Sequence, residues 1–510
     1  MNALAAEPTL AGRDAVEALR HLGRLIDDAT TLRDLPASER AIELGATIDP
    51  ATWPSAQRVD LFYFLANAWA NVRQLRPATK EEHWMWDRPE VFAELLNLRR
   101  AASESAFSAA PNIRRADVYT NLGNALSSIG RFVEALEYWE RAMPLNPDSG
   151  MGIGNRGYGR FHYARMLDDP GHRALFLRHA HADLEKALGR KLYREARDAF
   201  IRVKEEIETY FKPGSLGRSI DFKDFPLGDT EEEIAYRRWC LRGRLFLNPM
   251  NDLTTATVAA HDILTTPSIV TPIDEGPRYQ GFYNQMKQEF VSARFLLYEA
   301  ITTKAAHYSD RDVFLFDTYD YATYGLAAEK LKMAFRVFYS LLDKTGFFVN
   351  AYFRFGIDEG AVNFRTLWYE KGKKTLRPEL RERPNWPLRG LYWLSRDLVN
   401  NDADAHAALE PDARALAEIR NHLEHRYLKL HNEIPPATRA APGPLADDLA
   451  YSLWRGDLER RTARLAKLVR AAIIYLTLAI KVEERARAAK RPAGRILQAE
   501  LGRVPDEWKR

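Results

Sequence analysis

An arginine, an amide and a histidine stand close together in a helical segment of the last quarter of the sequence. The stretch Arg420-Asn421-His422-Leu423-Glu424-His425 places a histidine five residues after the arginine. Arginine stays charged and can grip a phosphate, whereas histidine titrates near neutral pH and can move a proton. That pair suits cleavage of RNA, in which the 2′-OH is the nucleophile. We therefore take Arg420, Asn421 and His425 as candidate catalytic residues.

Apolar residues around this stretch predict one continuous helix with a buried stripe. They recur at spacings of three and four, at Leu416, Ile419, Leu423, Tyr427 and Leu430. His425 falls on the opposite face, so packing does not require it, and a solvated polar face explains the pattern equally well. On an ideal helix Arg420 and His425 are about 140° apart, so both cannot point at one phosphate. Either the motif spans a helix start, or two copies of the chain combine their side chains at a twofold axis. We favour the second explanation, a symmetric dimer.

Composition limits the classes of protein that this chain can belong to. Its 510 residues allow several domains, and 46% hydrophobic with 28% charged residues is typical of a soluble protein. The net charge of +4 does not indicate a bulk polyanion binder. Cys240 is the only cysteine, which excludes intramolecular disulfides and cysteine-rich zinc sites.

The longest apolar run, 471–480, is about half as long as a helix that crosses a bilayer and predicts a buried helix. Residues Met1 to Arg20 lack the pattern of a signal peptide. We expect a cytoplasmic protein with no membrane partner.

Helical spacing dominates the chain, and one segment has the pattern of a repeat. Its marked positions are Tyr119, Leu122, Gly123, Gly130, Phe132, Ala135, Trp139, Ala142 and Pro147. These spacings resemble a tetratricopeptide repeat of about 34 residues. We assign the clearest unit to residues 116–149 and a second unit to 150–190, within a helical region of tetratricopeptide-like repeats over 1–210. Because a repeat cannot bury its apolar face alone, weaker helical pairs are expected before Pro111.

Glycines in the second unit also satisfy a dinucleotide-binding pattern, in Gly152-Ile153-Gly154-Asn155-Arg156-Gly157. That pattern has meaning only between a strand and a helix. Here it falls in register with the first helix of the repeat, so we reject cofactor binding and expect no cofactor.

Composition shifts to Pro, Gly, Asp and Lys over 211–229, which predicts a linker. Next come the element Leu247-Asn248-Pro249-Met250-Asn251-Asp252, helical patterns at 288–300 and 321–342, and then the Arg420 motif. Together with the upstream repeats, this order resembles the LA2681-like HEPN family over roughly 230–485. The sequence therefore predicts an all-α fold, with N-terminal repeats followed by a HEPN helical bundle at 230–490 and a tail at 491–510.

The resemblance implies a metal-independent endoribonuclease that dimerises through its motif-bearing helices. Arg420 and His425 match the family's arginine and histidine, and Asn421 matches the polar residue after the arginine. The products would carry a 2′,3′-cyclic phosphate, and a regulated toxin or anti-phage role fits the family. Two alternatives remain. The first is an inactive scaffold that dimerises and binds a protein or peptide partner on its repeats. The second is a metal-dependent hydrolase that uses Glu418, His422 and His425. The second lacks the His-Glu-x-x-His order of zinc peptidases.

A basic stretch supplies candidate RNA contacts at Lys371, Lys373, Lys374 and Arg377. Aromatic residues stand near it, at Trp368, Tyr369, Trp386 and Tyr392. Cations interleaved with aromatics can follow a phosphate backbone and stack bases, whereas the alternative, which we favour, is a basic loop packing its aromatics on the core. We expect His422 and His431 to be surface histidines.

Overall fold

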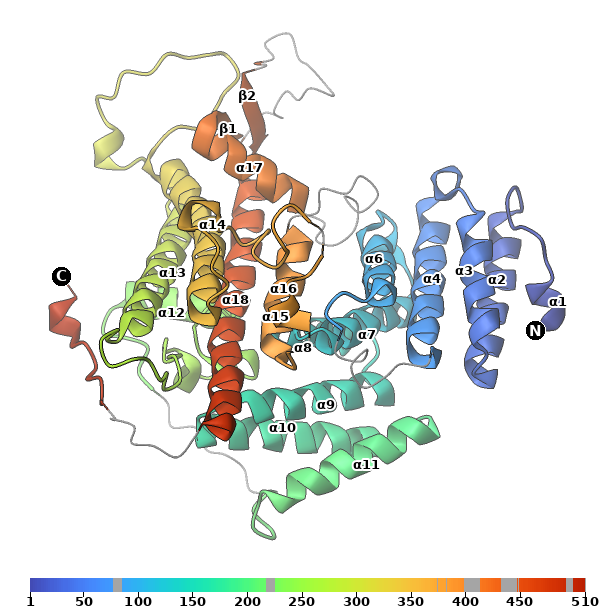
Figure 1. The fold of residues 1–510 in the computed structure, drawn as a ribbon. Helices are drawn as coiled ribbons and strands as arrows, with labels where there is room; N and C mark the ends of the chain where they lie inside the picture. The colour runs from blue at the N-terminus through green and yellow to red at the C-terminus, as the bar shows by residue number, and fades with distance from the viewer. Residues whose placement is uncertain are drawn as a thin grey trace.

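Helices make up nearly all the regular structure of this protein, as Figure 1 shows. The computed structural model describes residues 1–76, 85–216, 225–373, 375–381, 383–398, 413–432, 447, 449–491 and 499–509. Within these residues the strands are limited to one two-stranded sheet. The prediction of an all-α fold is confirmed.

Antiparallel helix pairs stack side by side through the N-terminal half (Figure 1). A short α1 (Asn2–Ala5) precedes them. The pairs are α2 (Ala15–Leu32) with α3 (Leu35–Ala46), α4 (Ser55–Leu75) with α6 (Pro89–Ser103), α7 (Asn112–Ser128) with α8 (Phe132–Ala142), and α9 (Gly150–Met166) with α10 (Pro170–Leu188). The single helix α11 (Arg194–Thr209) packs against α9 and α10. Each pair covers the apolar face of the next, as stacked repeats require.

Glycines permit the close packing within the clearest repeat. A Cβ atom on Gly123 would lie 2.5 Å from Nε1 of Trp139, so only glycine lets α7 and α8 approach this closely. Gly130 in the turn has φ +90°, a left-handed conformation that glycine adopts without steric cost. The two glycines of the repeat pattern thus permit the contact between the helices and the turn that joins them.

The glycine-rich stretch at 152–157 lies inside α9, not at a turn between a strand and a helix. A Cβ atom on Gly157 would lie 2.9 Å from Cβ of Asp183 in α10, and one on Gly154 would overlap the ring of Phe200 in α11. These glycines therefore serve helix packing.

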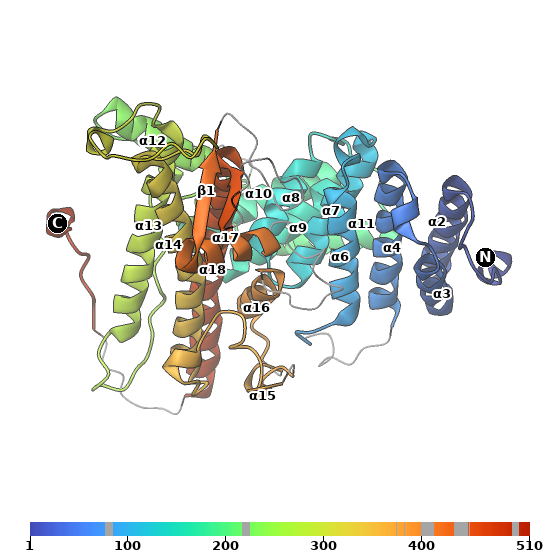
Figure 2. The ribbon, with the colours of Figure 1, turned by 90° about the horizontal axis from the view of Figure 1, so that it is seen from above.

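Long helices build the C-terminal half, where α13, α14 and α18 lie side by side (Figures 1 and 2). Its helices are α12 (Glu231–Gly243), α13 (Arg278–Thr302), α14 (Leu326–Phe353), α15 (Pro378–Arg381), α16 (Trp386–Leu398), α17 (Ala413–His425) and α18 (Arg455–Lys490). The apolar run 471–480 lies in α18 and is buried throughout, as predicted. No described helix combines the length and apolar character that a bilayer crossing requires.

Two short strands correct the sequence prediction around the motif. β1 (Tyr427–His431) pairs in parallel with β2 (Ala450–Trp454), and on its other side the amide of Thr323 donates to the carbonyl of Leu430 at 2.7 Å. The predicted helix through Tyr427 and Leu430 is therefore wrong, because α17 ends at His425. Both strand contacts come from distant segments, which local spacing cannot reveal.

His431 was expected at the surface and that prediction is also wrong. Its side chain is 2% exposed, and its Nδ1 shares a hydrogen bond with the carbonyl of Asp320 at 3.1 Å. The residue lies where β1 meets the segment before α14.

A single hydrophobic core joins the repeats to the C-terminal bundle. It runs from Val59 in α4 to Ile480 in α18. At the junction the backbones of Gly130 and Gly390 pack directly, since a Cβ atom on either would overlap the other segment's backbone. Nε1 of Trp386 donates to the carbonyl of Ser127 at 2.9 Å. The N-terminal end of α16 is thus fixed to the turn of the clearest repeat.

Buried ion pairs cross this junction. Asp397 in α16 forms ion pairs with Arg131 and, at 2.6 Å, with Arg99, and Arg131 also pairs with Glu134. The hydroxyl of Tyr475 in α18 donates to Glu134 at 2.6 Å. All five side chains are almost completely buried, so each charge depends on its partners for solvation.

Replacing Glu137 with glutamine is expected to weaken the same junction in a pH-dependent way. Burial alone would raise the pKa of Glu137, but Lys467, Arg464 and Arg141 hold it at about 2, below the usual 4.5. The folded-state pKa is thus lower than the unfolded one, so this stabilisation is present above pH 4.5 and is lost as the pH falls towards 2. We expect Glu137→Gln to lower the free energy of unfolding at pH 7 by roughly 3 kcal/mol. Urea denaturation at several pH values measures this.

The difference from wild type should shrink as the pH falls below 4.5. An exposed control, Glu205→Gln in α11, should match wild type throughout. A Glu137→Gln deficit that stays constant down to pH 2 would contradict the electrostatic explanation.

Candidate active site

Helix α17 carries the Arg420 motif and packs against α14, α16 and β1. It begins at Ala413, seven residues before Arg420, and Leu416, Ile419 and Leu423 are buried as predicted. The motif therefore occupies the C-terminal end of a helix, and the alternative that it spans a helix start is wrong.

Arg420 is half-buried and its guanidinium lies over the ring of Tyr339 in α14, 5.8 Å from the ring centre. Burial and the nearby Asp343 raise the pKa of Tyr339, while Arg365 and Arg420 oppose that rise. The phenol therefore stays neutral and provides an aromatic face for the cation. Among the described residues no carboxylate forms an ion pair with Arg420, so its charge is available to an anion.

Asn421 and His425 are both exposed, and His425 is the last residue of α17. Within the described part of the chain, no hydrogen bond or ring contact joins Arg420, Asn421 and His425 to one another. Because the helix is continuous, the offset of about 140° between Arg420 and His425 applies here. One chain thus places the three side chains at the same helix end but not in a single cluster.

Arg336 of α14 also belongs to this region and was missed in the sequence. It donates to the carbonyl of Leu423 and its Nε lies 3.8 Å from the carboxylate of Glu424. Carbonyls at a helix C-terminus lack helical donors and carry partial negative charge, so a cation stabilises them. Arg336 and Tyr339 lie on a helix far upstream, and nothing in their local sequence links them to α17.

Comparison with protein-family models matches residues 270–483 to the LA2681-like HEPN family. The chain carries an LA2681-like HEPN domain. Residues 116–149 match the tetratricopeptide repeat, over α7 and α8. No curated protein and no solved structure matches the chain. HEPN domains are commonly ribonucleases, so the match indicates a ribonuclease or a nucleotide-related function.

The match to the HEPN domain begins after the element at 247–252, which the resemblance had included. Asp252 of that element pairs with Arg470 of α18 at 2.6 Å and accepts from the hydroxyl of Tyr163 in α9 at 2.9 Å. The side-chain amide of Asn251 donates to the carbonyls of Leu241 and Thr254. The element is buried and connects a repeat helix to the HEPN domain, so its role is structural.

His422, which was expected at the surface, is half-buried in the HEPN domain. Its ring stacks on Tyr451 of β2 with centroids 4.8 Å apart, and its Nδ1 shares a hydrogen bond with the carbonyl of Glu418 at 2.8 Å. Among the described residues no three His, Cys, Asp or Glu side chains are grouped as a metal site requires. Glu418, His422 and His425 therefore do not form the ligand set of the metal-dependent alternative.

The basic stretch of the HEPN domain makes mostly local contacts. Lys373 pairs with Glu370 at 2.7 Å, and Nε of Arg377 donates to the carbonyl of Leu367 at 2.7 Å. Lys371 is exposed, and Lys374 lies outside the described residues. Trp368 and Tyr392 are completely buried and cannot stack on bases. The geometry favours a basic loop whose aromatics pack on the core, and an RNA-binding role for Lys371, Lys373, Lys374 and Arg377 stays a prediction.

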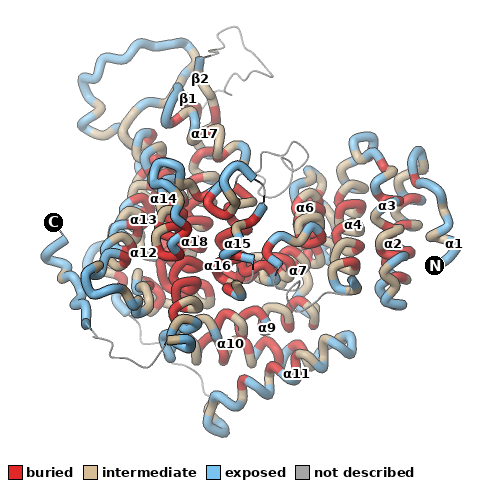
Figure 3. The backbone as a smooth tube through the Cα atoms, in the orientation of Figure 1, coloured by how far each residue is buried: buried red, intermediate tan, exposed pale blue. Residues whose placement is uncertain are grey.

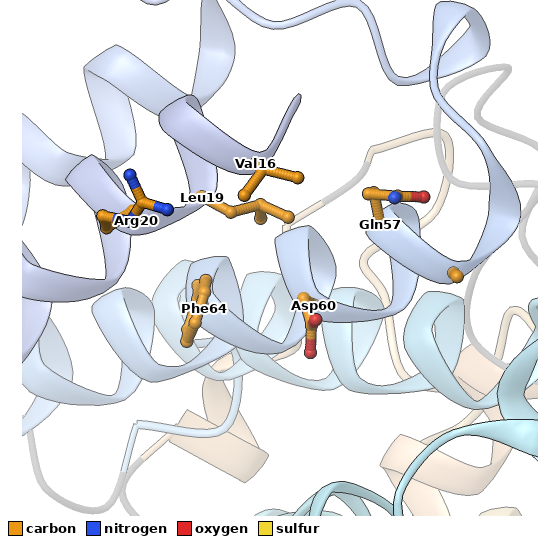
Figure 4. A pocket seen from close by; sticks show the side chains of 7 residues that line it. Val16, Leu19, Arg20, Gln57, Asp60 and Phe64 are labelled. Atoms are coloured by element: carbon orange, nitrogen blue, oxygen red, sulfur yellow. The ribbon is translucent and has the colours of Figure 1, made fainter. Parts of the chain in front are cut away.

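A pocket of about 320 Å³ lies between α2 and α4, in the repeats and not beside α17 (Figure 4). Its apolar wall consists of Val16, Leu19 and Phe64, and Arg20 and Asp60 supply opposite charges at its edge.

Proposed function

We propose that this protein is a metal-independent endoribonuclease that cleaves RNA by attack of the 2′-OH. One observation carries the proposal: Arg420, which has no carboxylate partner among the described residues and lies over Tyr339, is at the same helix end as the exposed His425 within the HEPN domain. A phosphate-binding cation and a proton-transfer group are the two functions that this reaction needs.

The reaction would proceed by proton transfer at two oxygens. His425 removes the proton of the 2′-OH, and the 2′-oxygen then forms a bond to phosphorus. The bond from phosphorus to the 5′-oxygen breaks, and His425 of the partner subunit protonates that leaving oxygen. The products are a 2′,3′-cyclic phosphate and a 5′-hydroxyl.

Arg420 would hold the scissile phosphate and stabilise the added negative charge of the transition state. Asn421 would orient His425 or donate a hydrogen bond to the phosphate. Because Arg420 and His425 are about 140° apart on one helix, a homodimer that joins two α17 ends through the HEPN domains would complete the site.

We propose a regulated toxin or anti-phage effector as the biological role, with the repeats binding a protein or peptide that controls cleavage. The pocket between α2 and α4 supports this role for the repeats. The competing function is an inactive scaffold that dimerises and binds a partner. It is favoured by the lack of any contact between Arg420, Asn421 and His425 in the described part of one chain.

Cleavage of total and synthetic RNA in excess EDTA tests the proposal. Wild-type protein is expected to cut RNA with chelator present and to leave 2′,3′-cyclic phosphate and 5′-hydroxyl ends. A substrate with a 2′-deoxy nucleotide at the cleaved position should resist, because it lacks the nucleophile. Cleavage that EDTA abolishes, or cleavage of the deoxy substrate, would contradict this mechanism. No cleavage of any RNA with or without metal would favour the scaffold.

A further inference from the structure

The segment between α13 and α14, residues 303–325, exposes an unusual set of apolar side chains; we call it the aromatic loop. Residues 311–319 are all exposed, and Figure 3 shows the loop projecting from the HEPN domain in pale blue. Its exposed large hydrophobic residues are Tyr308, Val313, Phe314, Leu315, Phe316, Tyr319, Tyr321 and Tyr324, with Phe314 exposed by 83% and Phe316 by 80%. An exposed patch of this kind on a folded protein marks an interaction site.

The base of the aromatic loop is firmly attached. The carboxylate of Asp310 accepts from the amide of Leu326 at the start of α14, and Asp320 pairs with Lys429 of β1 at 2.6 Å. Three non-glycine residues on the loop, Asp312, Tyr319 and Tyr321, have φ of 60°, 60° and 55°. Bulky residues adopt this conformation at a cost, which surrounding structure must offset. These contacts give the base of the loop a defined conformation. The exposed tip itself does not explain that conformation.

The exposed aromatic area of the loop is large enough for a stable interface between proteins. An aromatic side chain buries about 150–250 Å² when it is fully covered. Six aromatic residues, which are 47–83% exposed, therefore offer at most roughly 600–1,000 Å², a range that includes the ~800 Å² that each partner contributes to a standard interface.

Charge argues against RNA as the occupant. Residues 303–325 contain four aspartates, one lysine and one arginine, a formal charge of −2, which a polyanion avoids. The cationic end of α17 lies at the same end of the HEPN domain, joined to the loop through β1 (Figure 1). It carries Arg420, His425 and the exposed Arg426, and among the described residues neither arginine is paired with a carboxylate. The chain therefore presents both halves of a complementary surface side by side.

We infer that the aromatic loop is the surface through which two copies of this chain bind. The tip of each loop packs on Arg426 at the α17 end of the other copy, so that Arg420 and His425 stay open to RNA and the same two patches meet twice across the twofold axis. This inference rests on the homodimer of the proposed function and names the contact that holds it. It also gives the partner's loop a place beside the catalytic residues, as a wall that excludes water.

Light scattering on the full-length protein tests the inference. Wild type is expected to be a dimer at micromolar concentration, and Phe314→Ser/Phe316→Ser to raise the dimer dissociation constant by roughly a hundredfold or more, since buried aromatics dominate interface energies. Tyr193→Ser, in a residue 75% exposed before α11, is the matched control and should leave the mass unchanged. Circular dichroism checks that each variant is folded.

A charge exchange tests the choice of partner. Asp317→Arg is expected to weaken the dimer, and adding Arg426→Asp to the same chain should restore it, because the loop and the α17 end would again carry opposite charges. A monomeric wild type overturns this inference and the proposed homodimer together, while the EDTA cleavage assay still reports on catalysis. A dimer unaffected by the loop variant overturns the inference alone. If the loop variant keeps the mass of the wild type but loses RNA binding, the inference is also overturned and the loop is assigned to RNA.

Discussion

Replacing His425 with alanine is expected to slow RNA cleavage by about 10²–10⁴-fold, the usual contribution of a positioned acid or base. The fold should be unaffected, because the side chain is exposed at the end of α17. Arg420→Ala should cost about 10²–10³-fold through lost stabilisation of the transition state. Arg420→Lys should recover only part of this, because lysine lacks the planar fork that grips a phosphate. Single-turnover cleavage of a labelled RNA measures all three.

Arg414→Ala is the matched control, since Arg414 lies on the same helix with a side chain 76% exposed. It should cleave as wild type does. Full activity of His425→Ala would remove His425 from the mechanism and direct attention to other groups at this helix end.

Mixing variants tests whether two copies share the reaction. If each scission uses both His425 side chains of a dimer, a mixed dimer of wild type and His425→Ala should be inactive. Excess His425→Ala should then suppress wild-type cleavage, whereas excess His172→Ala, altered at a histidine in α10, should not. If an excess of neither variant suppresses wild-type cleavage, each copy acts alone.

Replacing Asp397 with alanine should lower the free energy of unfolding by about 3–5 kcal/mol, because it leaves buried cations without their counterion. Asp397 is 1% exposed and pairs with Arg99 and Arg131 across the junction of repeats and HEPN domain. Chemical denaturation followed by circular dichroism measures the change. Asp148→Ala, at a carboxylate 74% exposed, is the control and should change stability by less than about 1 kcal/mol. A similarly small effect of Asp397→Ala would mean that water reaches these arginines.

Local pattern was sufficient for much of the fold. The roles of Gly123 and Gly130, the buried run at 471–480 and the stripe at Leu416, Ile419 and Leu423 all follow from spacing within one helix or one hairpin. The repeat and the HEPN domain were likewise recognisable in the sequence. The domain boundaries, including the linker at 211–229, stay predictions, and so do the catalytic roles of Arg420, Asn421 and His425.

The features that the sequence could not predict are contacts between residues far apart in the chain. The strand at Tyr427–His431 and the burial of His431 require β2 and the aromatic loop. The platform that Tyr339 provides for Arg420 joins helices about eighty residues apart. The pairing of Asp397 with Arg99 crosses 298 positions. No local spacing carries such information, because each contact exists only once the helices have packed.

The described residues show the backbones of Gly130 and Gly390 in direct contact where the repeat at 116–149 meets the HEPN domain, without a flexible connection at this point. A flexible linker would let a bound partner sample a wide volume, and its effective concentration at α17 would fall with linker length. Here α16 is fixed to the repeat turn at one end and packs on α17. A partner that binds the repeats would therefore be held at one distance and orientation from Arg420, so its size and shape would decide whether it covers the end of α17.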